Sequence, residues 1–185
     1  GALYRLTALY ARRQGAAWSD EAAVAALAAR LPAAFAVGRV LLDGEDVEDE
    51  IRSEAVGMGA SEVAQHPAVR AALLQRQRGF QTASGLVADG RDMGSVVFPD
   101  AALKVFLTAS AQVRAQRRAK QLGLPCEGVA FARILSDIEA RDEADRRRAA
   151  APLKQLPDAL LLDTSDMGIE EAVKKVIDWY EQKQN

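Results

Sequence analysis

The sequence is poor in the residues that most often carry redox, metal or nucleophilic chemistry. Among 185 residues there is one cysteine, Cys126, and one histidine, His66. A single cysteine excludes an internal disulfide, which fits a reducing compartment. The two residues together are too few for a Cys/His metal site. His66 would also have to serve any Ser-His-Asp triad, and it precedes Pro67 in a turn-like segment, so we predict no catalytic role for it.

Aromatic residues, long apolar runs and excess charge are also scarce. Aromatics make up 5% of the chain, and no apolar run is long enough to span a bilayer. The net charge of −2 does not predict a nucleic-acid or membrane binder. Since 49% of the residues are hydrophobic, the composition is that of an ordinary globular protein. With no signal peptide at its start, the chain is predicted to be cytoplasmic, with no membrane or nucleic-acid partner.

Apolar spacing predicts a mainly helical first half. A small hairpin is expected over 33–46, where the chain alternates weakly and then stops at Asp43-Gly44. Pro67 is favoured at the start of a helix. The predicted helices cover 2–13, 19–31, 47–65 and 67–80.

The second half carries three short apolar runs, each followed by polar or turn residues. These runs are 85–90, 103–108 and 159–164, and long helical stretches separate them. Such spacing is typical of a buried parallel sheet with crossover helices. We therefore predict an α/β fold, with a helical pair over 110–123 and 129–152 and a closing amphipathic helix over 167–183.

Basic residues gather in the segment 114–148. It holds nine Lys or Arg residues and six acids, within a chain whose net charge is negative. Arg141, Asp145 and Arg148 have the spacing of one helix face, and Arg114 and Arg118 share a face of the preceding helix. The segment could be a solvated helical hairpin held by ion pairs along its helices. Arginine also binds phosphate oxygens with a planar, bidentate fork, so a hairpin over a polyphosphate is the functional alternative.

The segment Ala-Asp-Gly-Arg-Asp-Met-Gly, residues 88–94, follows the first apolar run directly. In an open α/β sheet, ligands bind beyond the carboxyl ends of the strands. Asp89, Arg91 and Asp92 would lie at such an end. Aspartate and glycine are also common in turns, so a solvated turn is the alternative.

Several segments resemble bacterial cytidylate kinases. They are Tyr4-Arg5 and the ranges 42–54, 60–80, 88–107 and 141–153, in the order of that family and reaching to about Asp166. The resemblance implies a P-loop nucleoside monophosphate kinase-like fold, with a parallel sheet, flanking helices, a small NMP-binding insert and a helical lid. It implies core helices over 1–32, the insert over 33–84, core strands over 85–113, the arginine-rich lid region over 114–150, and a core strand and C-terminal helix over 151–185.

The family's reaction moves the γ-phosphoryl of ATP to CMP or dCMP with Mg²⁺, and the resemblance implies this for the chain, as a monomer. It assigns Ser61, Arg70 and Asp92 to the cytosine, because a carboxylate can accept from the exocyclic amino group that uracil lacks. Asp145 would bind ribose hydroxyls. The remaining implied residues are Tyr4, Arg5, Arg91, Arg141 and Arg148 around the acceptor, with Arg91, Arg141 and Arg148 as the catalytic set, and Arg114, Arg117 and Arg118 for the lid over ATP.

The sequence departs from the family in one motif. It contains no G-x-x-x-x-G-K-[ST], the loop that cradles phosphates and supplies a hydroxyl to Mg²⁺. We expect the family's first strand and this loop to precede the segment that matches Gly1, so that the sequence is a fragment. Mg²⁺ would then be held through the nucleotide and that loop, with no metal ligand here. We therefore expect little kinase activity from the chain as printed.

Two other functions remain open on the sequence. A non-catalytic nucleotide- or RNA-binding module could use the same arginines, but RNA binders usually add aromatic stacking residues. No aromatic residue lies among Arg141–Arg148. A sister monophosphate kinase with another base preference is the third possibility, and Asp92 with Ser61 and Arg70 suits cytosine better than a purine.

Overall fold

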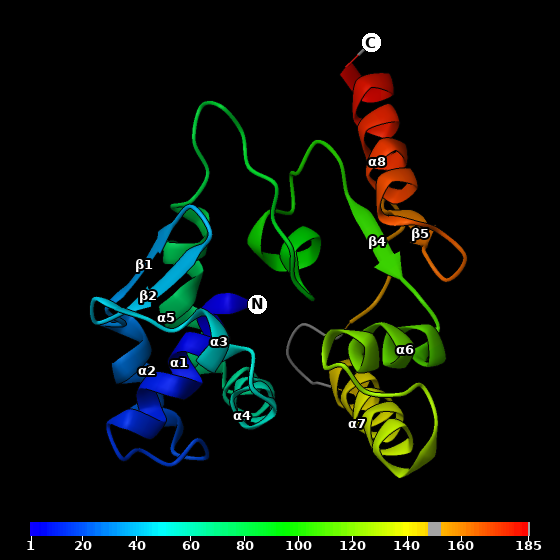
Figure 1. Ribbon diagram of the computed structural model, residues 1–185. Coiled ribbons are helices and arrows are strands. Elements are labelled where there is room, and N and C mark those ends of the chain that lie inside the picture. The colour runs from blue at the N-terminus through cyan, green and yellow to red at the C-terminus, as the bar shows by residue number, and fades with distance from the viewer. Residues whose placement is uncertain (148–152, 185) are drawn as a thin grey trace. The chain divides into compact units, whose positions relative to one another are not determined.

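The computed structural model describes residues 1–147 and 153–184 (Figure 1). The chain forms two compact units, Gly1–Arg91 and Asp92–Asn185. Each unit has a cluster of buried apolar side chains of its own. Helices dominate both units, and the strands form two separate small sheets.

The first unit is mainly helical, as the apolar spacing predicted. α2 begins where the Asp20 carboxylate accepts a hydrogen bond from the backbone N–H of Ala23, and α5 begins at Pro67. The helix predicted over 47–65 is instead two helices, because the Ser53 hydroxyl caps a second one. The helices are α1 (Ala2–Arg13), α2 (Glu21–Ala29), α3 (Glu48–Ile51), α4 (Glu54–Val63) and α5 (Pro67–Arg78).

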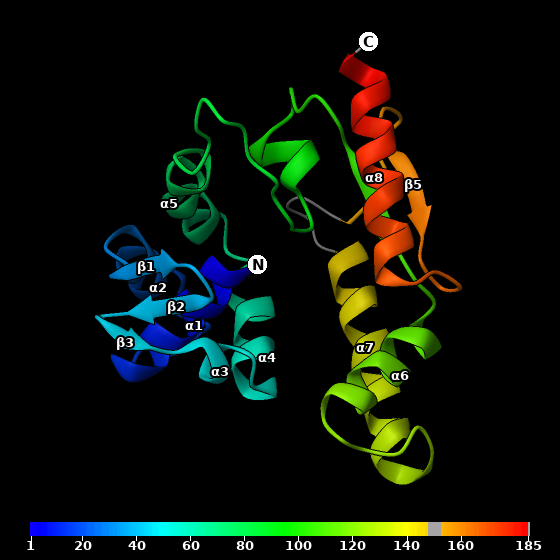
Figure 2. The ribbon, with the colours of Figure 1, turned by 45° about the horizontal axis from the view of Figure 1, so that its top comes forward.

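The predicted hairpin is present and gains a short third strand. β1 (Ala33–Ala36), β2 (Arg39–Leu42) and β3 (Glu45–Asp46) form one antiparallel sheet in that order (Figure 2). Gly38 in the first turn and Gly44 in the second have φ of 68° and 83°. Both turns therefore need the left-handed backbone that glycine adopts without strain.

The core of the first unit lies between its helices and one face of the hairpin. Leu6 and Leu9 of α1, Val24 of α2 and Leu73 of α5 are fully buried, as is Leu42 of β2. This burial removes large aliphatic side chains from water and holds the helices around α1. It also fixes the first turn of α1, which carries two of the predicted site residues, Tyr4 and Arg5.

The second unit has the predicted parallel strands with crossover helices. β4 and β5 pair in parallel, with Val105 opposite Leu160 and Thr108 opposite Asp163. The chain between them forms two helices that pack on each other through Ala115, Ala119 and Phe131. The elements are β4 (Val105–Thr108), α6 (Ala111–Gln121), α7 (Gly128–Arg147), β5 (Leu160–Asp163) and α8 (Ile169–Gln184).

The strand predicted over 85–90 does not form. The segment has an isolated bridge between Thr82 and Gly85 and otherwise runs without regular structure, and Val87 is fully exposed. A strand exists only where its backbone groups find a neighbouring strand. Within the described residues this segment has no neighbouring strand, so its apolar run is not sufficient to form a strand. The prediction of a strand at this place was wrong.

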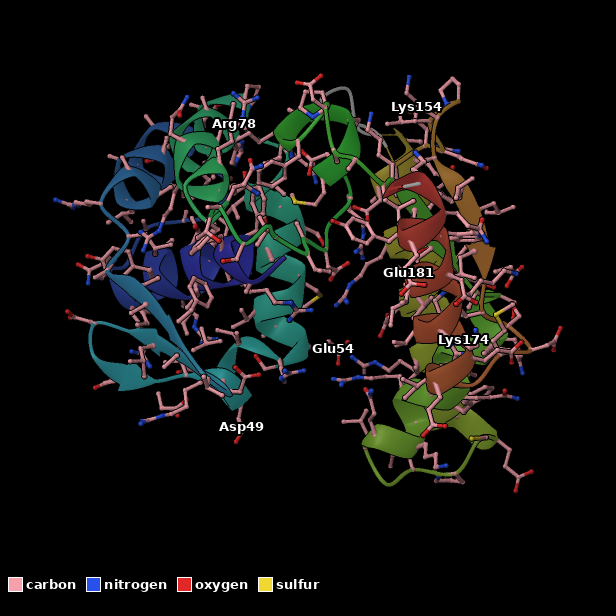
Figure 3. The ribbon with its side chains drawn as sticks, turned by 90° about the horizontal axis from the view of Figure 1, so that it is seen from above. Asp49, Glu54, Arg78, Lys154, Lys174 and Glu181 are labelled. Carbon is pink, nitrogen blue, oxygen red and sulfur yellow. The ribbon has the colours of Figure 1, made fainter. Side chains whose placement is uncertain are left out.

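Apolar side chains remain exposed in the second unit. On α8 they form a stripe at helical spacing, made of Ile169, Val173, Ile177 and Tyr180. The polar side of the helix carries charges such as Lys174, which donates to Asp178 at 2.7 Å, and Glu181 (Figure 3). None of the helices that the structure describes is long and apolar enough to cross a membrane.

Candidate functional site

The segment 88–94 leads into an unusual turn rather than a simple loop. Asp92 is 5% exposed, and its carbonyl accepts hydrogen bonds from the backbone N–H groups of Val96 at 2.9 Å and Val97 at 3.3 Å. The second bond spans five residues, as in the π-helix formed by Met93–Val97. Such turns are rare and are often found at functional sites. The predicted cytosine-reading carboxylate therefore belongs to a residue that is held in place, not one left in water.

Two of the predicted site residues, Tyr4 and Arg70, come together in the first unit, and a third, Ser61, lies on α4, which packs against α1. The guanidinium carbon of Arg70 lies 5.9 Å from the ring centre of Tyr4, a cation–π distance. Arg70 also donates to the carbonyl of Ala64 at 3.3 Å. Ser61 lies one helical turn before Ala64, and its hydroxyl donates to the Gly57 carbonyl at 3.3 Å. Helices α1, α4 and α5 thus each contribute one of the three residues.

Arg5 and the segment of Arg91 belong to the same end of α1. Arg5 donates to the carbonyl of Ile51 at 2.6 Å, which ties α1 to the end of α3. The nitrogen of Gly1 lies 3.5 Å from the carbonyl oxygen of Asp89, two residues before Arg91. The first turn of α1 is therefore next to the polar segment that the sequence singled out.

In the second unit, Arg114 is bound within the protein. One terminal nitrogen donates to Asp142 Oδ1 at 2.9 Å and the other donates to Oδ2. Its Nε donates to the carbonyl of Ala109 at 3.0 Å. The hydrogen bonds with Asp142 raise the pKa of Arg114 above its ordinary value, against the opposing effect of burial. Sequence reasoning missed Asp142 because its partner lies 28 residues away on another helix.

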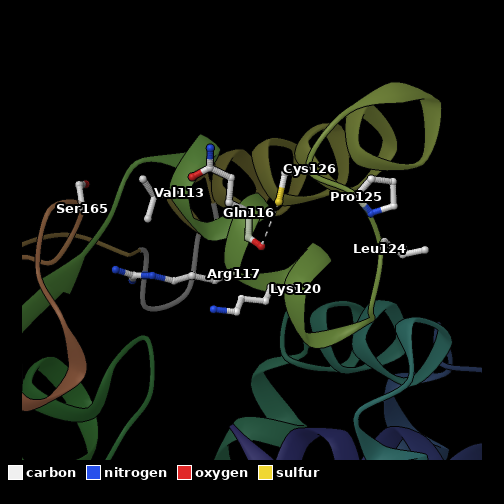
Figure 4. A pocket seen from close by; sticks show the side chains of 8 residues that line it. All are labelled: Val113, Gln116, Arg117, Lys120, Leu124, Pro125, Cys126 and Ser165. Carbon is white, nitrogen blue, oxygen red and sulfur yellow. Dashed lines mark hydrogen bonds between the residues drawn. The ribbon is translucent and has the colours of Figure 1, made fainter.

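Arg117 contacts the loop that follows β5. It donates to the Thr164 hydroxyl at 3.1 Å and to the carbonyls of Thr164 and Met167. A hollow of about 570 Å³ lies beside it (Figure 4). Lys120 and the exposed Cys126 line this hollow, which is formed by Val113, Gln116, Arg117, Lys120, Leu124, Pro125, Cys126 and Ser165.

The rest of the predicted arginine cluster is described only in part. Arg141 and Asp145 are both half-buried on α7, four residues apart and so on one face. Arg148 lies outside the described residues. Because the predicted residues belong to two units, their convergence around one ligand stays a prediction.

The single histidine of the sequence makes a contact within the protein. His66 Nε2 lies 2.8 Å from the carbonyl oxygen of Trp18, at the start of α5. Within residues 1–147 and 153–184, no group of three or more His, Cys, Asp or Glu side chains is placed to hold a metal ion.

Comparison with known proteins gives a consistent result. Residues 1–182 match the family model described as cytidylate kinase. A cytidylate kinase of Neisseria gonorrhoeae is 72% identical over 180 residues, covering 97% of this chain and 83% of that protein. The cytidylate kinase of Chromobacterium violaceum is 59% identical over 184 residues, covering 100% of this chain and 83% of that protein. That of Pseudomonas fluorescens (strain Pf0-1) is 51% identical over 183 residues, covering 96% and 80%.

Proposed function

The chain belongs to the cytidylate kinase family, and we propose that it serves the transfer of the γ-phosphoryl group of ATP to CMP or dCMP, giving CDP or dCDP. The match over residues 1–182, which includes every predicted site residue, carries this proposal. The chain is thus assigned to a family of enzymes with mixed α/β folds, nucleotide substrates and kinase chemistry.

Cytosine recognition is proposed for Ser61, Arg70 and Asp92. A carboxylate accepts from the exocyclic amino group of cytosine, and uracil offers an oxygen at the same place. The low exposure of Asp92 supports this role, because a buried carboxylate left facing an acceptor oxygen costs more than one in water. The stacking of Arg70 on Tyr4 supports the role of Arg70, since this contact limits the positions that the guanidinium can take.

Phosphate and ribose binding is proposed for the remaining acceptor residues. Phosphoryl transfer requires two anionic groups held in line and their charge neutralised, with little covalent help from the protein. Arginines suit this task because they remain charged and bind phosphate oxygens in pairs. We assign the ribose hydroxyls to Asp145, with Arg141 nearby. The acceptor phosphate is assigned to Arg5, Arg91 and Arg148, beside Tyr4. The set proposed to act on the transferring phosphoryl is Arg91, Arg141 and Arg148.

ATP is proposed to bind under the arginine-bearing helix α6, the lid of the family. Arg117 and Arg118 are the proposed contacts to its phosphates. The sequence pattern predicted the same role for Arg114, but its guanidinium is bonded to Asp142 and to the carbonyl of Ala109. Within the described residues, no group of three or more acidic side chains is placed to bind Mg²⁺. We therefore assign it no ligand in this part of the chain and derive no step through it.

The organisation of the chain follows as part of the same proposal. We propose the ranges 33–84 as the NMP-binding insert and 114–150 as the lid region, between core segments at 1–32, 85–113 and 151–185. We further propose a cytoplasmic monomer, a setting that suits its exposed free thiol.

A non-catalytic nucleotide- or RNA-binding module is the alternative. It would use the basic surface of α6 and α7, but aromatic side chains for base stacking are absent from the described part of these helices apart from the buried Phe131. A sister kinase would differ in its base preference, which the experiment below measures.

Calorimetric titration of the chain with CMP, UMP and AMP tests the acceptor assignment. We expect CMP to bind, UMP to bind about tenfold or more weakly, and AMP to show no binding, because one charged hydrogen bond is lost with uracil. The Asp92→Ala variant should lose about ten- to a hundredfold in CMP affinity and its preference over UMP. Asp100→Ala, an exposed acid eight residues on, is the matched control. Equal affinity for all three nucleotides would rule out base reading by this chain.

A further inference from the structure

A bidentate ion pair between Arg114 and Asp142 joins α6 to α7. Both terminal nitrogens of Arg114 donate to the two carboxylate oxygens of Asp142, one of them at 2.9 Å. The side chains are 35% and 21% exposed, so water screens this pair less than the ion pairs of the surface. A planar guanidinium facing a carboxylate in this way fixes direction as well as distance.

The pair also reaches the strand that precedes α6. Arg114 Nε donates at 3.0 Å to the carbonyl of Ala109, the residue after β4. Arg146, four residues after Asp142 on α7, lies 3.9 Å from the same carboxylate. One arginine thus holds the end of β4, helix α6 and helix α7 together.

These contacts leave Arg114 poorly suited to bind a phosphate. Its Nε and both terminal nitrogens each donate to a protein oxygen. A phosphate could take its place only by displacing a carboxylate that already neutralises it. Arg118, one turn further along α6, differs in that no hydrogen bond or ion pair of its side chain is found within residues 1–147 and 153–184.

The position of Asp142 in the sequence gives the pair a consequence for binding. Asp142 follows Arg141 directly and precedes Asp145 by three residues, all within α7. Successive residues of an α-helix are separated by a rotation of 100°, so holding one side chain sets the directions of its neighbours. A small rotation of α7 about its axis would move Arg141 and Asp145 together.

We propose that Arg114 and Asp142 are a positioning pair, which sets the rotation of α7 so that Arg141 and Asp145 meet the acceptor nucleotide. Neither residue touches the nucleotide in this assignment, and Arg114 is not an ATP ligand. The inference rests on the proposed function for the roles of Arg141 and Asp145.

The test compares Arg114→Gln, Asp142→Asn, the double variant and the exchanged pair Arg114→Asp with Asp142→Arg. CMP affinity is measured by calorimetry, and hydrogen exchange is followed over residues 139–147. We expect each single variant to lose about tenfold in CMP affinity, the double variant to lose no more than either, and the exchanged pair to recover part of it. Exchange over 139–147 should accelerate in both single variants.

Direct phosphate binding by Arg114 would give a different result. If Arg114 bound the CMP phosphate, Arg114→Gln would weaken CMP binding while Asp142→Asn would not. If Arg114 bound ATP instead, neither variant would weaken CMP binding. Either outcome would overturn the proposal. A merely structural role would lower the melting temperature and leave CMP affinity unchanged, which would also overturn it. Lys120→Gln, at an exposed position of α6, is the matched control, and its exchange over 139–147 should equal that of the unmodified chain.

Hydrogen exchange separates this inference from the proposed function. If the unmodified chain binds no CMP, the acceptor assignment fails, and exchange alone then decides on the pair. Faster exchange over 139–147 in both single variants, recovered in the exchanged pair, would still support Arg114–Asp142 as the device that holds α7. Unchanged exchange would contradict it.

Discussion

At the scale of single residues, arginines that look alike in the sequence have different partners. Arg70 stacks on Tyr4, and Arg114 pairs with Asp142. Arg76 donates to two backbone carbonyls, that of Leu31 after the end of α2, at 2.5 Å, and that of Ala33 at the start of β1. The first of these side chains belongs to the proposed binding surface, whereas the other two join elements of the fold.

Gly59 is required by the close approach of an aromatic ring. A Cβ atom at this position would lie 2.5 Å from the Trp18 ring, which is held by a hydrogen bond to the Ala8 carbonyl at 2.9 Å. We expect Gly59→Ala to destabilise the chain by about 1–3 kcal/mol, as overpacked cores do. Denaturant unfolding gives the value, and Met58→Ala, at an exposed neighbouring position, should change it little. A stabilised Gly59→Ala variant would show that the ring moves freely.

At the scale of elements, several helices depend on residues that lie outside them. α5 starts at Pro67, and its orphan N–H at Ala68 donates to Glu21 of α2 at 2.9 Å. A carboxylate at a helix N-terminus satisfies a donor and opposes the positive end of the helix dipole. The two helices are thereby coupled through one side chain.

Replacing Glu21 tests this coupling. Glu21→Ala should lower the free energy of unfolding by about 1 kcal/mol, because the first turn of α5 loses its acceptor. Glu21→Gln keeps an oxygen acceptor and should lose less, since it gives up only the charge. Thermal unfolding of the two variants at neutral pH makes the comparison. If both variants unfold like the unmodified chain, water replaces the carboxylate without cost.

The ion pair between Lys104 and Asp158 should make the start of β5 sensitive to acid. The hydrogen bond from Lys104, at 2.6 Å, lowers the pKa of Asp158 below its ordinary value of 3.8. The pair therefore contributes stability above that ordinary value, and the contribution is lost as the pH falls through the lowered pKa.

A pH series measures this contribution. The melting temperature of Asp158→Asn should lie below that of the unmodified chain at pH 7, and the difference should shrink as the pH falls below 3.8. Asp100→Asn, at an exposed position, serves as the control and should show no such trend. A difference that stays constant with pH would mean that the charge of Asp158 is not involved.

At the scale of the whole molecule, the two units differ in how much apolar surface they bury. The first has a core built from five helices and a hairpin. The second buries a small cluster between α6 and α7, while side chains such as Leu107, Leu161 and Ile169 are more than half exposed. Since stability follows apolar burial, the units should not be equally stable.

Hydrogen exchange along the chain tests that difference. We expect amides of α1 and α2 to be protected longest, and amides of α8 and of the β4–β5 pair to exchange at least about tenfold faster. Equal protection of α1 and α8 would show that the exposed apolar stripe of α8 is covered in solution.

The chain as printed is also expected to turn over CMP slowly. Because its sequence contains no G-x-x-x-x-G-K-[ST] loop, we expect turnover of CMP to be lower by at least about a hundredfold than when a strand and such a loop are fused before Gly1. A coupled assay of ADP release compares the two forms. Full turnover by the printed chain would mean that other residues hold the donor phosphates.

The sequence alone was sufficient for most of the helices, the hairpin, the parallel pair and the family, but it did not show the break between α3 and α4. Apolar periodicity and the start at Pro67 are local signals, and the family motifs are strings of residues. The run 85–90 was misread because a strand depends on a neighbour, which no local pattern supplies.

Tertiary structure decided what the arginines contact. The sequence placed Arg114 with its neighbours on α6 as a phosphate ligand by charge and spacing, and the fold brings Asp142 to it from 28 residues away. It also brings Arg70 over Tyr4, from α5 to α1. Charge and helical spacing are properties of one segment of the chain. The partner of a side chain depends instead on how two distant segments pack, and no local sequence pattern predicts that packing.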